Sequence, residues 1–318
     1  MAVTLDNGVA GLNQFAVQKA PYIHQKLRVG LEWEKMLTPR ACKHTYSAPN
    51  AVPTEIIQAY QWQFTPKGGV DFSAVENTLQ PIKIDIMITA EDLEVFWDSY
   101  MIEWHEIGLD PMEWTFPRYL YENVYLPKIL EEMNQNAWSG IYQAPVTGTA
   151  GLSINSVDGY KKKIEDAITA GDLTEYPTGP LLANTMVEQM ENWCDSLPIP
   201  YRNRPGAILM SPTNAQRYWR DYRTLFGTGN SVSNNENNEL RIDATQKRIK
   251  PVIAMEGSDR IIFNPDSIQN QIWGTRVRKP TYFNLRWEKT ERIIKGLAEI
   301  YRFYGFEFWD HLFVNDQA

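Results

Sequence analysis

The order of the expected elements places this chain of 318 residues in the α+β class. Helical patterns fill the middle of the sequence, and strand patterns come before and after them. The clearest strand pattern is IKIDIMI, in which isoleucines alternate with polar Lys83 and Asp85 over residues 82–88. Strands that are grouped apart from helices are typical of α+β proteins, whereas strict βαβ alternation would predict a parallel sheet.

The composition excludes several classes of protein. Charged residues make up 22% and apolar residues 43% of the sequence, and the net charge is -8. An acidic chain argues against a dedicated sequence-reading nucleic-acid binder, while the 11 tryptophans favour a surface that binds protein. The sequence shows neither a signal-peptide pattern nor an apolar run of the ~18 residues that span a bilayer, and Cys42 and Cys194 form no CxxC pair. We therefore expect a soluble protein of a reducing compartment, with no membrane partner.

Residues 1 to about 50 mix basic and apolar side chains without a sustained period. Such a segment is too apolar for a solvated tail and too irregular for a domain of its own. It predicts an extended arm that buries apolar residues, Trp33 among them, against a neighbouring subunit. The alternative is an N-terminal strand or helix that packs on its own domain.

Residues 56–88 are expected to form a two-stranded hairpin. The first strand would be IIQAYQWQF and the return strand IKIDIMI, with turn chemistry at Pro66, Gly68 and Gly69. The far end of this hairpin carries aromatic side chains that its own chain could not bury, namely Trp62, Phe64 and Phe72. These residues are therefore candidates for contact with another subunit.

A short helix and a long one are expected next. Thr89 with Asp92 resembles a capping box and would begin a helix that runs to Tyr100. The stretch Thr115–Gly140 has the apolar period of one long amphipathic helix, with Gly140 at its C-terminal cap. Pro127 either lies in the first turn of this helix or kinks it.

The rest of the chain predicts further helices and then strands. Helices are expected over Val157–Ile168 and over Leu182–Leu197. A third helix would begin at the Ser211 cap and Pro212, and its inward side chains would be Ala215, Tyr218, Trp219, Tyr222 and Leu225. Strands are expected in AILM, LRIDATQKRIKPVIAM and DRIIFN, and a polar loop from Phe226 to Glu239. Asn264-Pro265 would begin a short helix that bears Ile268 and Ile272. From Thr281 the chain returns to strands, with a turn at Gly305.

No catalytic or metal-binding pattern is present. Trp104-His105-Glu106 begins like the HExxH zinc motif, but Leu109 stands where the second histidine is needed. Gly227-Thr228-Gly229 lacks the Gly-Lys-Ser/Thr ending of a phosphate loop, and Ser211 is explained as a helix cap. We therefore expect no enzyme activity, no metal and no cofactor.

The acidic segment Glu91–Glu113 leaves one enzymatic alternative open. Paired carboxylates beside Trp97, Trp104 and Trp114 are the kind of site that a carbohydrate-active enzyme or sugar-binding module uses, although a solvated or DNA-repelling face is the commoner explanation. The C-terminal third is locally basic. This charge asymmetry suits head-to-tail contacts between identical subunits, and the alternative is that the charges solvate separate faces.

The order of these segments is specific enough to suggest a family. The irregular arm is followed by the hairpin that ends in IKIDIMI, the TAEDL helix and the long helix that ends in NAWSG. Then come ILMSPTNAQRYW, GSDRIIFNPDSIQNQIWG and the closing RFYGFEFWDHLFV. Over nearly the whole chain this pattern of elements resembles the major capsid proteins of tailed bacteriophages, which share the Hong Kong 97 fold.

The resemblance implies a division of the chain into six segments. They are an N-terminal arm at 1–45, an extended hairpin called the E-loop at 46–88, a peripheral domain with a spine helix at 89–145, an axial domain at 146–265, peripheral return strands at 266–305 and a C-terminal segment at 306–318.

The same resemblance implies a structural function. Copies would assemble into hexamers and pentamers that close into an icosahedral head around double-stranded DNA, in a virion assembled in the host cytoplasm. Scaffolding, portal and decoration proteins are the implied partners, together with non-specific contact with the packaged DNA. Because no long charged helical prefix is present, scaffolding would be a separate protein or the chain would already be mature. A related alternative is an encapsulin-like compartment that holds a protein cargo.

Some members of the family are crosslinked through a lysine of the E-loop and an asparagine elsewhere. Lys67 lies near the expected hairpin tip, although a lone loop lysine is usually only solvated. The full set of candidates for contact between subunits is therefore Trp33, Trp62, Phe64, Lys67 and Phe72.

Overall fold

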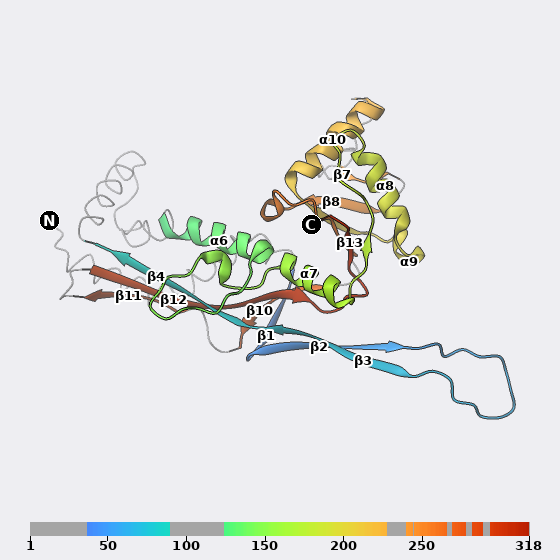
Figure 1. Cartoon of the computed structure of the whole chain (residues 1–318), viewed down its shortest axis with the longest axis horizontal. Helices are drawn as coiled ribbons and strands as arrows, with labels where there is room; N and C mark the ends of the chain where they lie inside the picture. Colours follow the sequence, from blue (N-terminus) through green and yellow to red (C-terminus); the bar gives the residue numbers. More distant parts are fainter. Residues whose placement is uncertain are drawn as a thin grey trace, which may run out of the picture. The chain divides into compact units, whose positions relative to one another are not determined.

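The computed structural model describes residues 37–89, 124–227, 240–243, 245–265, 269–277, 282–288 and 293–317 (Figure 1). The described residues divide into two compact units. The first unit contains the described residues within 37–44, 79–158 and 274–303, and the second unit those within 45–78, 159–273 and 304–317.

The first unit is organised around the long strand β12. Its five-stranded sheet has the order β1-β10-β12-β11, and β4 also pairs with β12. The strands are β1 (Thr38–Cys42), β4 (Gln80–Ile88), β10 (Gln271–Arg276), β11 (Tyr282–Glu288) and β12 (Ile293–Phe306). The pairing of β4 with β12 is antiparallel, from Ile294↔Ile88 to Arg302↔Gln80.

Helix α6 (Leu126–Ser139) packs on this sheet. Leu126 and Met133 of the helix form a cluster with Ile300 of β12, against which Ile82 and Ile84 of β4 also pack. The alternation in IKIDIMI is therefore explained as predicted, because the isoleucine side of β4 packs against the apolar face of α6. The long-helix prediction is confirmed over Leu126–Ser139, with Pro127 in the first turn. Its residues 115–123 and the short helix expected from Thr89 lie outside the described residues.

Gly140 ends α6 in an extended conformation. Its N–H donates to the carbonyl of Asn136 at 3.0 Å, and its φ is -62°. A Cβ at this position would overlap the carbonyl oxygens of Val157 and Asn136. Glycine is therefore required here for close backbone approach, and the C-terminal cap expected at Gly140 is confirmed.

The second unit has a six-stranded sheet of order β5-β13-β9-β6-β8-β7. Its strands are β5 (Glu175–Tyr176), β6 (Gly206–Met210), β7 (Leu240–Arg241), β8 (Lys247–Pro251), β9 (Ile262–Pro265) and β13 (Phe313–Asn315). Helices α8 (Met186–Ser196) and α10 (Pro212–Phe226) cover one face (Figure 1). Trp193 of α8 and Tyr218 of α10 share a buried cluster with Phe263 of β9. The remaining short elements are α7 (Tyr160–Ala170), α9 (Ile199–Arg202), η2 (Ser153–Asn155, in the first unit) and η3 (Ile253–Met255).

The second unit also contains a long antiparallel hairpin. Strand β2 (Thr45–Pro53) pairs with β3 (Val70–Thr78), from Thr45↔Thr78 to Pro53↔Val70, and residues 54–69 connect them (Figure 1). The hairpin expected from the sequence was therefore wrong in its strands. IIQAYQWQF lies in the connecting loop, and IKIDIMI is the strand β4, whose partner is β12.

Other local predictions were also overturned. Residues 37–50, expected to be irregular, contain β1 and the start of β2. Pro265 ends β9 instead of beginning a helix, and Ile272 lies in β10. Gly305 lies within β12 instead of forming a turn, and Ile253–Met255 is a 3₁₀ turn. Trp219 and Leu225, which were expected to face inward, are exposed. Pro265 pairs with Gly206 of β6, so at this position pairing with a distant strand overrides the local signal.

Candidate assembly surface

The end of the β2–β3 hairpin exposes large apolar side chains. The exposed fractions are 94% for Trp62, 90% for Phe64 and 82% for Phe72, and those of Ile57 and Tyr60 are similar. A soluble chain scatters single apolar residues over its surface, but a contiguous exposed group marks an interaction site. We call residues 54–72 the tip, and its exposed apolar side chains are Ile56, Ile57, Tyr60, Trp62, Phe64, Val70 and Phe72.

Polar groups of the tip bond to one another and leave the apolar side chains outside. Thr54 donates from its N–H and its hydroxyl to the carbonyl of Gly69, at 3.0 and 3.1 Å, and its Oγ1 accepts from the Gly69 N–H. The side-chain amide of Gln58 donates to the carbonyl of Thr65 at 2.7 Å. Gly68 has a φ of +93°, which a residue with a side chain would adopt only under strain. The loop is thus closed by hydrogen bonds before any partner arrives.

Lys67 takes part in this closure. Its Nζ donates to the carbonyl of Ile57 at 2.9 Å and lies 3.0 Å from a carboxylate oxygen of Glu55. Its amine is therefore engaged within its own loop. The suggested crosslinking role remains a prediction that nothing in the described residues supports.

The structure brings four of the five candidate residues together. Trp62, Phe64 and Lys67 lie in the connecting loop and Phe72 lies in β3, all within the tip. Trp33 lies outside the described residues. Sequence reasoning did not single out Ile57 and Tyr60, although both stand in the same apolar stretch.

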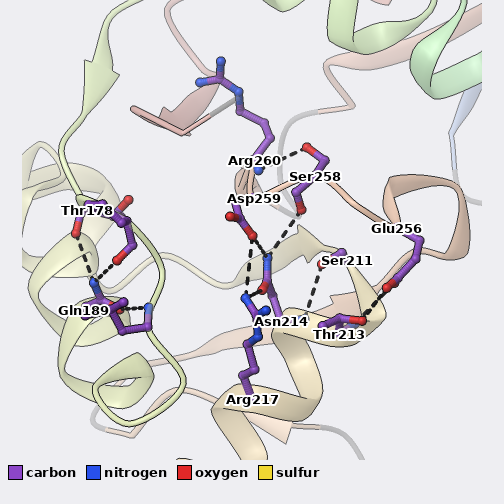
Figure 2. A network of polar contacts seen from close by, with 12 residues as sticks. Thr178, Gln189, Ser211, Thr213, Asn214, Arg217, Glu256, Ser258, Asp259 and Arg260 are labelled. Atoms are coloured by element: carbon purple, nitrogen blue, oxygen red, sulfur yellow. Dashed lines mark hydrogen bonds and ion pairs between the residues drawn. The ribbon is translucent and has the colours of Figure 1, made fainter.

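A second polar cluster lies at the beginning of α10 (Figure 2). The Asn214 side-chain amide donates to Asp259 at 2.9 Å and accepts from Arg217 at 3.0 Å. Thr213 donates from its hydroxyl to Glu256. The N-cap predicted from the sequence is confirmed, because the Ser211 hydroxyl accepts from the Asn214 N–H at 3.3 Å. These groups satisfy one another, so the cluster is explained as the joint between α10 and the turn at residues 256–259.

The parts of the chain that the structure describes contain no group of three or more histidine, cysteine or acidic side chains that could hold a metal ion. Within the same parts, no helix is both long enough and apolar enough to cross a bilayer. The acidic segment Glu91–Glu113, on which the carbohydrate alternative depends, lies outside the described residues.

Lys247 is a buried amine in the core of the second unit. It has no exposed surface, its Nζ donates to the carbonyl of Arg202, and the amine lies 4.9 Å from the centre of the Phe263 ring. Burial lowers the pKa of Lys247, and the nearby Cys194 and Asp195 oppose this shift. Burial also raises the pKa of the Cys194 thiol, to about 12. Since no substrate can reach a fully buried amine, we assign Lys247 a structural role.

We expect Lys247→Met to leave the free energy of unfolding unchanged or to raise it by about 1 kcal/mol at pH 7, because an apolar side chain avoids the cost of burying a charge. In the folded protein, Lys247 loses its proton at a lower pH than in the unfolded chain, where the lysine pKa is about 10.4. Between these two pKa values, the unfolded chain holds a proton on Lys247 that the folded protein has lost. Wild-type stability should therefore rise with pH through that interval relative to the variant.

Urea denaturation at neutral and alkaline pH measures this difference, with Lys250→Met as the matched control on an exposed position of the same strand. A Lys247→Met protein that is clearly less stable than the control at pH 7 would show that the buried ammonium contributes net stability.

Comparison with known proteins gives a clear result for the fold alone. No protein-family model matches the sequence, and no curated protein matches it either. A chain of the satellite phage P4 procapsid including size determination (Sid) protein is similar in structure, with a TM-score of 0.59 and 8% identity, over 93% of this chain and 90% of that chain. A chain of the capsid of the native GTA particle is similar with a TM-score of 0.52 and 10% sequence identity, over 91% of this chain and 89% of that chain.

The holo-SrpI encapsulin complex from Synechococcus elongatus PCC 7942 gives a TM-score of 0.46, which is too low to argue a shared fold. For the two capsids above, the similarity covers nearly the full length of both chains in each pair. The mixed α+β class expected from the sequence and the resemblance to phage capsid proteins are therefore confirmed at the level of the fold. The chain has the fold of these phage and particle capsid subunits.

Proposed function

We propose that this protein is the major capsid protein of a tailed phage, which assembles into hexamers and pentamers and closes into an icosahedral shell around double-stranded DNA. The observation that carries the proposal is the tip, where Trp62, Phe64 and Phe72 are almost fully exposed. An isolated subunit gains nothing from such a surface, whereas a subunit in a shell can lay it on a neighbour. The capsid-type fold supports the same function.

The size of the apolar tip is adequate for this purpose. An aromatic side chain carries about 150–250 Å² of surface, and burial is worth about 25 cal/mol per Å², so each ring contributes at most about 4–6 kcal/mol. Association costs roughly 4–15 kcal/mol in lost freedom of motion. Two or three buried rings therefore offset that cost in a contact between two subunits. In a closed shell each subunit both gives and receives such a contact, which stabilises the assembly further.

The segments of the fold have corresponding roles in this proposal. The β2–β3 hairpin and its tip are the E-loop, helix α6 is the spine helix of the peripheral domain, and the sheet of the second unit with α8 and α10 is the axial domain around the centre of each capsomer. The arm expected at 1–45 does not extend through Thr38–Cys42, which is the strand β1 of the first sheet. Scaffolding, portal and decoration proteins, and the packaged DNA, are the expected partners.

Electron microscopy with light scattering on the purified protein tests the proposal. We expect closed shells, or rings of five and six subunits, from the protein expressed alone or with its neighbouring genes. A strict monomer under every condition would contradict assembly and favour the carbohydrate alternative, which a glycan-binding screen then examines. Nuclease-treated particles from the producing cells should contain protected double-stranded DNA, whereas a protein cargo without DNA would indicate an encapsulin-like compartment.

A further inference from the structure

Among the described side chains, those of the hairpin that are buried against the rest of the second unit lie near its root. Along β2, Tyr46, Ala48 and Asn50 are at least partly buried, and along β3 so are Val75 and Asn77. Cross-strand pairing places Tyr46 opposite Asn77 and Ala48 opposite Val75, so these residues share one face of the hairpin. From residue 54 through residue 74, every described side chain is exposed.

The surface beneath this face is the end of β12 and the turn that follows it, residues 305–310. The Tyr46 hydroxyl donates to a carboxylate oxygen of Glu307 at 2.7 Å, and the side-chain amide of Asn77 donates to the carbonyl of Phe306 at 3.2 Å. Further out, Asn50 lies 3.4 Å from a carboxylate oxygen of Asp310. The paired residues Tyr46 and Asn77 thus both bond to the same short turn.

The fit at this turn leaves little freedom. Asn77 is 2% exposed, and its side chain fills the space that a Cβ at Gly305 would take. The turn itself is fixed by Asn270, which is fully buried and whose Oδ1 accepts from the N–H groups of Glu307 and Phe308 at 3.1 and 2.7 Å. A rigid turn and a tightly seated asparagine make this contact a joint with one geometry.

We infer that the contact between the hairpin root (Tyr46, Ala48, Asn50, Val75 and Asn77) and residues 305–310 is a positioning joint that sets the direction of the tip. The hairpin acts as a lever, because a rotation of ~10° at the root moves a point about 25 Å along the strands by about 4 Å. A shift of that size takes an aromatic side chain out of its pocket on a neighbour. The consequence for shells rests on the proposed function, but the joint itself is a property of the subunit.

Spin labels at Gln63→Cys in the tip and Asn192→Cys on α8 report the direction of the hairpin, since both positions are exposed and the native cysteines are buried. In dissociated subunits we expect Tyr46→Phe and Asn77→Ala each to broaden the distance distribution about twofold. Glu76→Ala, next to Asn77 but on the opposite face, is the matched control.

Conservative changes separate positioning from general stability. Glu307→Gln keeps an oxygen that accepts from Tyr46 and should retain the narrow distribution, whereas Glu307→Ala should broaden it. Combining Glu307→Ala with Tyr46→Phe should add little, because both remove one hydrogen bond. Tyr46→Phe removes only an oxygen atom, so it keeps the inference testable if Asn77→Ala does not fold. We expect the broadened variants to form malformed or open particles.

The two proposals fail in different ways. Unchanged distance distributions in Tyr46→Phe and Asn77→Ala, with wild-type shells that form normally, would overturn the joint and leave the capsid function standing. Broadened distributions in a wild-type protein that never assembles would support the joint and contradict the capsid function.

Discussion

Replacing Trp62 and Phe64 together by serine should abolish shell formation while leaving the subunit as stable as the wild type. Both side chains are about nine-tenths exposed, so the folded subunit loses almost no packing when they are removed. In an assembled contact, loss of a buried aromatic anchor costs about 2–4 kcal/mol, and two such losses lower the affinity of a contact by several orders of magnitude. Electron microscopy and sedimentation velocity measure the assembly, and thermal unfolding measures the stability.

The matched control is a second pair of exposed apolar residues in the same unit. Ile199 and Ile253 are 80% and 74% exposed, and neither lies in the tip. Ile199→Ser with Ile253→Ser lowers surface hydrophobicity in the same way, and we expect it to assemble. Shells formed by the Trp62→Ser, Phe64→Ser protein at wild-type yield would show that the tip is not an assembly contact.

The sequence predicted those elements whose signals are local. The period-two pattern of IKIDIMI became β4, the Ser211-Pro212 pair begins α10, and Gly140 ends α6. Each of these depends on a few neighbouring residues, so composition and spacing are sufficient to predict it. The α+β class followed from the order of such elements.

Predictions that needed a distant partner failed. The apolar alternation in IIQAYQWQF resembles a strand, but β2 and β3 take the hairpin pairing and leave these residues in the loop. Asn264-Pro265 has the same cap-and-proline pattern as Ser211-Pro212, yet Pro265 pairs with Gly206 in a sheet. A sequence gives the propensity of each segment but not the competing pairing, and the pairing decides.

In the hairpin too, local features were predictable from the sequence, whereas contacts with distant residues were not. Aromatic residues near a turn were enough to single out Trp62, Phe64 and Phe72, because such residues are rarely left in water without a partner. The joint at the hairpin root was not predictable, since Asn77 and the turn that it contacts are more than two hundred residues apart in sequence. Only the folded chain brings the two together.

The largest change in the stability of the subunit is expected from Gly274→Ala. Gly274 lies in β10, and the position of a Cβ there is occupied by the ring of Phe303, which is 1% exposed. A buried ring cannot rotate away without displacing its own neighbours, so the added methyl group overpacks the sheet. We expect the free energy of unfolding to fall by about 3 kcal/mol. Chemical denaturation followed by circular dichroism measures the change.

Two further variants show whether the Phe303 ring is the cause. Gly151→Ala adds the same methyl group where no atom lies within 4 Å, and it should leave stability unchanged or raise it by about 0.5 kcal/mol through the unfolded chain. Phe303→Leu removes part of the ring and should restore at least about 1 kcal/mol in the Gly274→Ala background, although it destabilises the wild type. If the losses of Gly274→Ala and Phe303→Leu were simply additive, the steric contact between these two strands would not be the source of the effect. Coupling of the expected sign would instead explain why β10 carries a glycine where a β-branched residue is otherwise favoured.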